Sequence, residues 1–180
     1  IRFLKSKQES AMSKKPVMGA GTVTDETFLP ALGDTALGVM TAHNYSATLD
    51  NPKNKDLREM ARKKLGKDPN WGISSSWVGM DWILRAIQNI NGDVESQDKL
   101  VKALRSVQME DSIRGPLKMD EYGHPIQDLY IRRADKAGSG YQNTVIKTYK
   151  QVSQFWNWDA KTYLSKPVYN RDNPPCKNCK

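Results

Sequence analysis

The chain has 180 residues, of which 38% are hydrophobic and 27% charged, a balance typical of a globular protein with one core of ordinary size. It contains no run of about 18 apolar residues, so the sequence predicts no membrane-spanning helix. The net charge is +8, but the 28 basic residues are scattered among 20 acidic ones, so we expect a solvated basic surface and no nucleic-acid module.

Helices and short strands alternate in the N-terminal quarter. Helical spacing of apolar residues begins at Ile1 and ends near residue 12, and residues 15–18 predict a short strand that leads into the loop 19–25. Residues 38–42 form a short apolar run between turn residues, which is typical of a buried strand. Because the chain starts within a helical pattern, without Met or a signal peptide, we expect it to begin inside an element.

The next segment predicts a well-delimited helix. Asp50 or Asn51 provides the N-cap, Pro52 occupies the first helical position, and Gly66 ends the helix. Four apolar residues recur at helical spacing and form its inner face: Leu57, Met60, Ala61 and Leu65.

Two further helices follow. The first is expected to begin after one of the serines at 74–76, which can accept a backbone hydrogen bond, and to continue to Gly92. The second has its cap near Ser96 and an apolar face that includes Leu104. Since no strand lies between these helices, we expect them to cover a sheet formed elsewhere.

Beyond Asp111 the composition changes to that of β-structure. Residues 112–120 and 126–133 are extended segments joined by a Gly/Pro turn, and residues 144–152 can pair with the second of them across the flexible connection 136–140. Alternating apolar side chains are expected to cover a strand surface at Ile126, Leu129 and Ile131. The region closes a sheet and builds no catalytic pocket.

The C-terminal tail is rich in aromatic residues and ends with two cysteines. Aromatic residues at this density usually dock a tail by burying area, although they could also stack on a ligand. The pair Cys176 and Cys179 could supply half of a zinc site, but no further ligands have finger-like spacing, so a local disulfide or a frayed end is expected. The aromatic residues are Phe155, Trp156, Trp158, Tyr163 and Tyr169.

The sequence offers no catalytic constellation. His43 and His124 are the two histidines, and neither lies in a nucleophile, metalloprotease or Cys-His motif. The glycine-rich string 19–22 lacks the third glycine and the Lys-Ser/Thr pair of a phosphate loop. We therefore predict neither an enzyme, nor a metal site, nor a cofactor.

Five features in a fixed order resemble one family. They are the helix ending near residue 12, the strand at 16–19, the segments 33–39 and 45–52, and Arg114-Gly115-Pro116. In this order they resemble the C-terminal part of the solute-binding proteins of branched-chain amino acid ABC transporters. These are two-lobed periplasmic binding proteins of the first structural type, and the resemblance covers the chain from Ile1 to about Pro175.

The resemblance implies an α/β fold of two lobes, with parallel sheets flanked by helices, of which only the C-terminal portion is present. It places residues 1–42 in the second lobe and the helices of 43–110 on the first lobe. Residues 111–155 would return to the second lobe through a hinge hairpin, and 156–180 would form the aromatic tail. The remaining N-terminal part of the same protein, with its signal peptide, would supply the missing strands.

The resemblance also implies a function and a site. A substrate-binding component captures a small solute between the lobes and delivers it to a membrane permease, without turnover. Ala20, Gly21 and Thr22 would lie in the ligand-contacting first loop, and Tyr45 would lie at the passage between lobes as an aromatic wall with a polar tip. Thr22 could equally cap the following turn, and Tyr45 could pack at the hinge.

One departure from the family bears on the ligand. Amino-acid binders of the family place a carboxylate in the first loop to pair with the ligand's ammonium group, whereas here the loop has Gly21 and Thr22 and reaches its first acid at Asp25. An aromatic or aliphatic carboxylate, or a small neutral amide, therefore suits the site better than an amino acid. The expected location is the periplasm. A ligand-sensing receptor domain of the same fold and a basic nucleic-acid-binding or scaffold protein are the alternatives.

Overall fold

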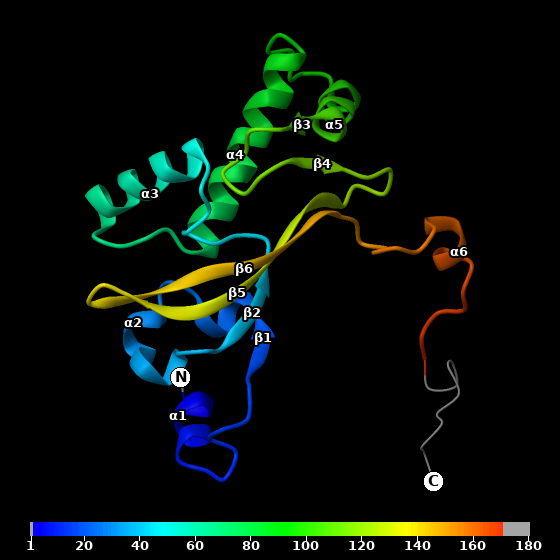
Figure 1. Ribbon diagram of the computed structural model, residues 1–180. Coiled ribbons are helices and arrows are strands. Elements are labelled where there is room, and N and C mark those ends of the chain that lie inside the picture. The colour runs from blue at the N-terminus through cyan, green and yellow to red at the C-terminus, as the bar shows by residue number, and fades with distance from the viewer. Residues whose placement is uncertain (1, 171–180) are drawn as a thin grey trace.

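Two long strands form the centre of the molecule. In the computed structural model, which describes residues 2–170, β5 (Pro125–Ala137) and β6 (Gly140–Val152) pair antiparallel along their whole length (Figure 1). This confirms the hairpin predicted from the sequence. The connection is a tight turn in which Gly138 has a φ of 58°, a left-handed conformation that favours glycine.

The second edge of β5 is shared between two partners. Its first part pairs with β4 (Leu117–Met119), and its later part pairs with β2 (Met40–His43), in both cases antiparallel. β1 (Met18–Ala20) lies parallel to β2, and β3 (Gln108–Met109) lies antiparallel to β4. One sheet of order β1-β2-β5-β4-β3, with β6 on the other side of β5, therefore joins two groups of elements.

The lower group in Figure 1 surrounds β1 and β2. It contains α1 (Arg2–Gln8), the 3-10 turns η1 (Gly21–Thr24) and η2 (Gly33–Ala36), and the short helix α2 (Leu29–Leu32). The first helix is shorter than expected and the first strand begins later. Six side chains form the core of this group: Leu4, Leu29, Leu32, Ala36, Val39 and Ala134.

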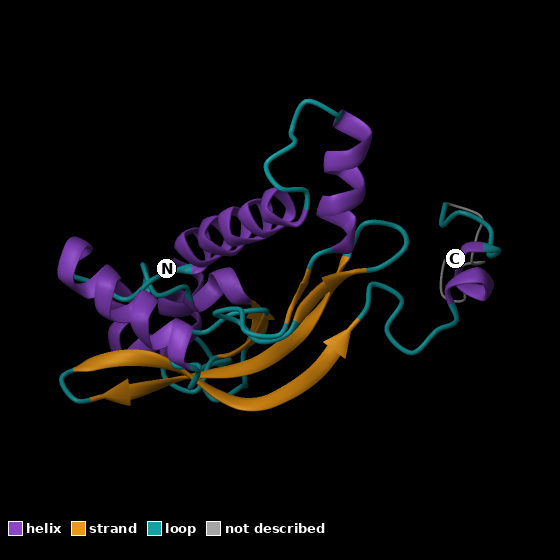
Figure 2. Ribbon diagram, turned by 90° about the horizontal axis from the view of Figure 1, so that it is seen from above, coloured by secondary structure: helices purple, strands orange, loops and turns teal. Residues whose placement is uncertain are grey.

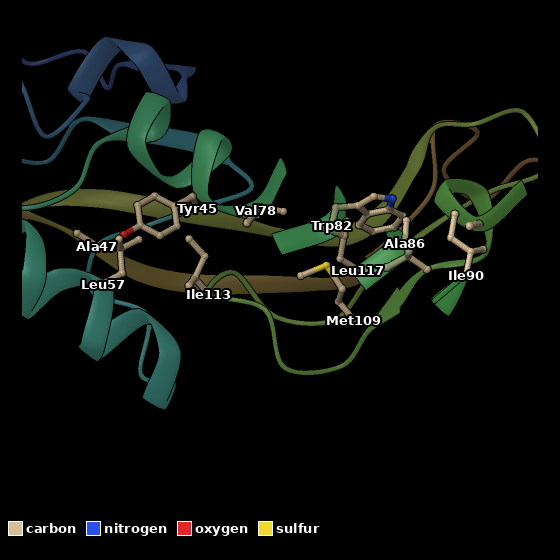
Figure 3. Close-up of a cluster of buried hydrophobic side chains, with 12 residues drawn as sticks. Tyr45, Ala47, Leu57, Val78, Trp82, Ala86, Ile90, Met109, Ile113 and Leu117 are labelled. Carbon is tan, nitrogen blue, oxygen red and sulfur yellow. The ribbon is translucent and has the colours of Figure 1, made fainter. Parts of the chain in front are cut away.

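The upper group consists of three helices whose buried side chains form one cluster with residues of β3, β4 and the segment after β2. These are α3 (Pro52–Leu65), α4 (Trp71–Asn89) and α5 (Gln97–Ser106). Trp82 of α4 lies against Leu117 of β4 and Met109 of β3 (Figure 3). The buried cluster includes Tyr45, Ala47, Leu57, Val78, Trp82, Ala86, Ile90, Ala103, Val107, Met109, Ile113 and Leu117.

The helix boundaries show which capping predictions were correct. Asn51 caps α3 by accepting the Asn54 N–H at 2.9 Å, and Gly66 ends the helix in the left-handed conformation, as predicted. The predicted start of α4 was wrong, because Asn70 is the cap and accepts the Ile73 N–H at 2.9 Å. The serines at 74–76 therefore lie inside the helix.

The outer side of α4 is apolar and is left uncovered by the described residues. Trp77, Met80, Ile83 and Leu84 are between 40% and 58% exposed. Charged residues normally occupy the solvent side of a surface helix, so this face has the character of a packing surface. That these helices cover a sheet formed by other residues stays a prediction.

The C-terminal tail runs away from the sheet after Val152 (Figure 2). Phe155 is buried and makes edge contacts with Tyr122 and Tyr163, but the expected burial of the other aromatic residues is wrong for this chain. Trp156, Trp158, Tyr163 and Tyr169 are between 47% and 82% exposed, and α6 (Ala160–Leu164) buries no residue.

Cys176 and Cys179 lie outside the described residues. No helix among residues 2–170 is long and apolar enough to cross a membrane.

Candidate functional site

The carboxyl ends of β1 and β2 meet at one edge of the sheet. Ala20 at the end of β1 pairs with Ala42 in β2, so the loops that follow both strands leave from the same edge. In open α/β sheets, ligands bind beyond the carboxyl ends of parallel strands. The predicted loop 20–22 and the segment 43–45 are therefore placed where a ligand site is expected.

The structure brings three of the four predicted residues together at this edge. Ala20 and Thr22 are exposed, whereas Gly21 between them is buried. The imidazole of His43 lies directly over Gly21, and a Cβ on Gly21 would be 2.1 Å from His43 Cδ2. Glycine is therefore the residue that permits the His43 ring to lie against the loop.

Tyr45 is placed differently. Its ring is fully buried in the upper cluster, and its hydroxyl donates a hydrogen bond to Asn54 Oδ1 at 2.9 Å. Burial raises the pKa of Tyr45 above its usual range. The side chain thus belongs to the core of the upper group, while its carbonyl oxygen accepts a hydrogen bond from Arg132 and lies 3.3 Å from His43 Nδ1.

Arg132 of β5 connects the loop after β1 with the segment after β2. Its Nη2 donates to the Gly21 carbonyl at 2.9 Å, and its Nη1 donates to the Tyr45 carbonyl at 2.8 Å. The side chain is 1% exposed. Sequence reasoning missed this residue, because its role depends on carbonyls from segments distant in sequence and no local motif marks it.

Glu26 supplies a counter-charge for Arg132. Its Oε1 lies 3.4 Å from Arg132 Nη1 and accepts a hydrogen bond from Asn143 Nδ2 at 3.0 Å. The other oxygen, Oε2, is buried without a hydrogen-bond partner. Burial raises the pKa of Glu26 in spite of the opposing charge of Arg132, and burial also lowers the pKa of Arg132.

A polar network continues from this pair into β6. Asn143 accepts a hydrogen bond from Thr24 Oγ1 at 2.8 Å and donates one to the Thr24 carbonyl at 2.7 Å. Its own carbonyl accepts hydrogen bonds from Ser46 and Thr48, both at 2.7 Å. The loop after β1, the segment after β2 and the hairpin are therefore held together by side chains that are mostly satisfied.

His43 is a neutral group at neutral pH. Its Nδ1 lies 3.3 Å from the carbonyl oxygen of Tyr45, which can only accept, so Nδ1 carries the proton. The pKa of His43 is lowered, first by burial and then by the positive charges of Arg132 and Arg114. The imidazole therefore adds no charge to the site.

Arg114 comes from the turn between β3 and β4. Its carbonyl accepts a hydrogen bond from Tyr130 Oη at 2.7 Å, and its N–H donates to Ser112 Oγ at 3.2 Å. The half-buried guanidinium makes no hydrogen bond or ion pair with residues 2–170, and its Nε is buried without an acceptor. Burial lowers the pKa of Arg114.

The loop after β1 is also fastened to the upper group. Asp25 Oδ1 accepts the Thr27 N–H at 3.0 Å, and Oδ2 accepts the Trp71 N–H at 3.2 Å. Asn70 donates to Thr27 Oγ1 at 2.8 Å. Both oxygens of Asp25, the first acid after the loop, are therefore engaged by backbone groups. The described part of the chain contains no cluster of side chains suited to a metal ion.

The sequence and the fold were compared with known proteins. A family model described as periplasmic binding protein matches residues 1–139. A Leu/Ile/Val-binding protein homologue from Brucella suis is 32% identical over 157 residues, which are 84% of this chain and 40% of that protein.

Solved structures agree. An ABC transporter substrate-binding protein from Sphaerobacter thermophilus has a TM-score of 0.78 at 27% identity, covering 83% of this chain and 41% of that one. A solute-binding protein from Rhodopseudomonas palustris, solved in complex with 3,4-dihydroxybenzoic acid, has a TM-score of 0.76 at 30% identity, covering 84% of this chain and 42% of that one.

The chain thus spans about 40% of the length of these relatives. The matched family is the one that the sequence resembles. The shared fold is a mixed α/β fold with a sheet flanked by helices, as the resemblance implied. The chain belongs to the periplasmic binding protein family, and the two solved structures above are substrate- or solute-binding proteins of ABC transporters.

Proposed function

We propose that this chain is the C-terminal part of the substrate-binding component of an ABC importer. In this proposal the protein captures a small solute in a cleft between two lobes and delivers it to the membrane permease. The observation that carries the proposal is the double pairing of β5, which joins β4 on one side of the hinge and β2 on the other. Binding would shift the population from an open to a closed arrangement about these strands.

The two groups of elements support a division into lobes. Residues 1–42 would belong to the second lobe and the helices of 43–110 to the first. The chain would return through 111–155 and end in the tail 156–180. Two separate hydrophobic clusters, one in each group, support this division. The exposed apolar side of α4 would be covered by strands of the N-terminal part of the same protein.

The solute would bind at the carboxyl edge of β1, with Ala20, Gly21 and Thr22 in contact with it. Tyr45 would take part through its carbonyl, which positions His43 and Arg132. No acid in this loop has a free oxygen for an ammonium group, since Asp25 is fully engaged. An aromatic or aliphatic carboxylate, or a small amide, fits better than an α-amino acid. The aromatic acid bound by the relative from Rhodopseudomonas palustris supports this class.

The location would be the periplasm, reached through a signal peptide in the precursor. The family and the absence of a membrane-spanning helix among residues 2–170 are compatible with this. The permease would recognise the closed form, and no catalytic step is proposed.

Thermal unfolding of the full-length protein with a panel of solutes tests the proposal. The panel contains branched-chain amino acids, aliphatic acids, benzoates and amides. A ligand that binds only the folded state raises its stability, so at least one class should raise the melting temperature in proportion to the logarithm of its concentration. The absence of any shift across the panel, at concentrations up to millimolar, would contradict the proposal.

A further inference from the structure

We infer that Arg114 is the residue that binds the carboxylate of the solute, and that the site selects an anion over the matching amide and over an α-amino acid. This inference rests on the proposed function, because it assigns a ligand class and a recognition residue to that cleft. It concerns a residue in the turn between β3 and β4, on the opposite side of the hinge from the loop after β1.

The position of Arg114 follows from the sheet. His43 of β2 is paired with Tyr130 of β5, and Thr41 is paired with Arg132. Paired residues in an antiparallel sheet have side chains on the same face, as do residues two apart in one strand. Tyr130 therefore shares a face with His43 and Arg132. Since Tyr130 Oη binds the carbonyl of Arg114, the turn is held over the face that carries the site.

The backbone on either side of Arg114 is fixed, so its side chain leaves from a defined point. Asn51 Nδ2 donates to the Ile113 carbonyl at 2.9 Å, and Ser112 Oγ donates to the Gly115 carbonyl at 2.6 Å. Gly115 has a φ of 92° and lies so close to Tyr130 that a Cβ would be 3.0 Å from the hydroxyl. A ligand-binding residue on such a support loses little freedom when it binds.

The charge of Arg114 is uncompensated. Its guanidinium forms no ion pair with the described residues, although it is half-buried, and its Nε has no acceptor. A partly desolvated cation without a partner costs free energy that an anion recovers. A carboxylate matches the planar fork of arginine and can accept two parallel hydrogen bonds from it.

Neighbouring acids do not provide the missing partner. Glu26 faces Arg132 and Asn143, and Asp25 accepts two backbone N–H groups. Asp128, on the same face of β5, accepts hydrogen bonds from Gln151 and makes no ion pair with residues 2–170. Arg114 is thus left without an ion-pair partner among residues 2–170, and it is the cation at this site that a solute carboxylate can pair with.

The test measures binding to the full-length protein by titration calorimetry. The probes are benzoate, 3,4-dihydroxybenzoate and isovalerate, with benzamide, isovaleramide and leucine as their amide and amino counterparts. We expect a carboxylate to bind and its amide to bind at least tenfold more weakly. Arg114→Gln should weaken carboxylate binding by about 10- to 100-fold, as expected for a hydrogen bond to a charged group, and Arg114→Lys should fall between the two.

The matched control is Arg133→Gln, which removes an exposed arginine paired with Asp135 and should leave binding unchanged. Circular dichroism without ligand checks that each variant is folded. If Arg114→Gln does not fold, Arg114→Lys still tests the inference. Two results would overturn the inference and leave the proposed function standing. In one, Arg114→Gln weakens the binding of amides and carboxylates equally. In the other, the wild-type protein binds an amide or leucine more tightly than the acids. Failure of every probe and of the wider solute panel would remove both.

Discussion

The carboxylate of Asp25 accepts a hydrogen bond from the backbone N–H of Trp71, so the loop after β1 is tied to the first turn of α4. A negative group at this end of the helix also interacts favourably with the helix dipole. The contact joins the lower and upper groups in addition to the β5–β6 hairpin, and Asn70 adds a second link to Thr27.

Removing this link should loosen the connection between the lower and upper groups. Asp25→Ala deletes the acceptors for Thr27 and Trp71, and we expect a loss of about 1–2 kcal/mol in the free energy of unfolding, as for a lost helix cap. Urea unfolding measures the loss, and small-angle scattering of the full-length protein should show a larger radius of gyration. Asp56→Ala, at an exposed position of α3, is the control. An unchanged radius for Asp25→Ala would show that the link does not hold the groups together.

Gly21 should not tolerate even one added carbon. Gly21→Ala places a Cβ 2.1 Å from His43 Cδ2, so the ring must move, and we expect a destabilisation of about 1–3 kcal/mol. The double variant Gly21→Ala/His43→Ala should recover part of this loss. Gly79→Ala in α4 is the control, because a Cβ there meets nothing within 4 Å, and it should stabilise the helix by about 0.5–1 kcal/mol. Thermal unfolding distinguishes these outcomes.

Arg132 should be among the least replaceable residues of the hairpin. Arg132→Met leaves the Gly21 and Tyr45 carbonyls and Glu26 without their donor, and breaking such a buried pair typically costs about 3–5 kcal/mol. Glu26→Gln in the same chain should restore part of the stability. The neighbour Arg133, which is exposed, serves as the control, and Arg133→Met should change the unfolding free energy by less than about 0.5 kcal/mol. Similar losses at both positions would contradict this account.

The buried carboxyl of Glu26 predicts a specific pH dependence. Its pKa in the folded protein is raised above the ordinary value of 4.5, so the folded state binds the proton more tightly than the unfolded state. Ionisation therefore costs stability as the pH rises above 4.5, and below that value the group is protonated in both states. The stability of the wild type relative to Glu26→Gln should increase as the pH is lowered from 7 towards 4.5. A constant difference over this range would exclude the raised pKa.

The outer side of α4 provides a test of the missing part of the protein. If N-terminal strands cover this face, Ile83→Asp should destabilise the full-length protein by at least about 2 kcal/mol, because a charge would be buried. Gln88→Asp, at an exposed position of the same helix, is the control. Little effect of Ile83→Asp in urea unfolding would mean that the face is solvated in the complete protein.

Local signals in the sequence predicted some elements well. The combination of Asn51, Pro52 and Gly66 defines α3 because a cap, a first-turn proline and a left-handed glycine each act within a few residues. The family resemblance pointed to Ala20 and Thr22, which lie at the carboxyl end of β1, and their contact with a solute stays a prediction.

The interior of the hinge could not be predicted in this way. Apolar alternation in β5 pointed to Ile126, Leu129 and Ile131, which are only half-buried. The buried face carries Asp128, Tyr130, Arg132 and Ala134. Two of these are charged, and their partners come from the loop after β1, the segment after β2 and β6. A pattern within one strand contains no information about partners that distant.

The contact between Val39 and Ala134 has a consequence for synthesis of the protein. Ala134 is fully buried in the lower core, and its N–H and carbonyl bind the Val39 carbonyl and the Gly38 N–H, each at 3.0 Å. During translation, the segment that contains Leu4, Leu29 and Leu32 therefore leaves the ribosome long before the strand that completes its core. Nascent chains of this protein should expose that apolar surface while the intervening helices are made, and should be substrates for chaperones that bind emerging polypeptides.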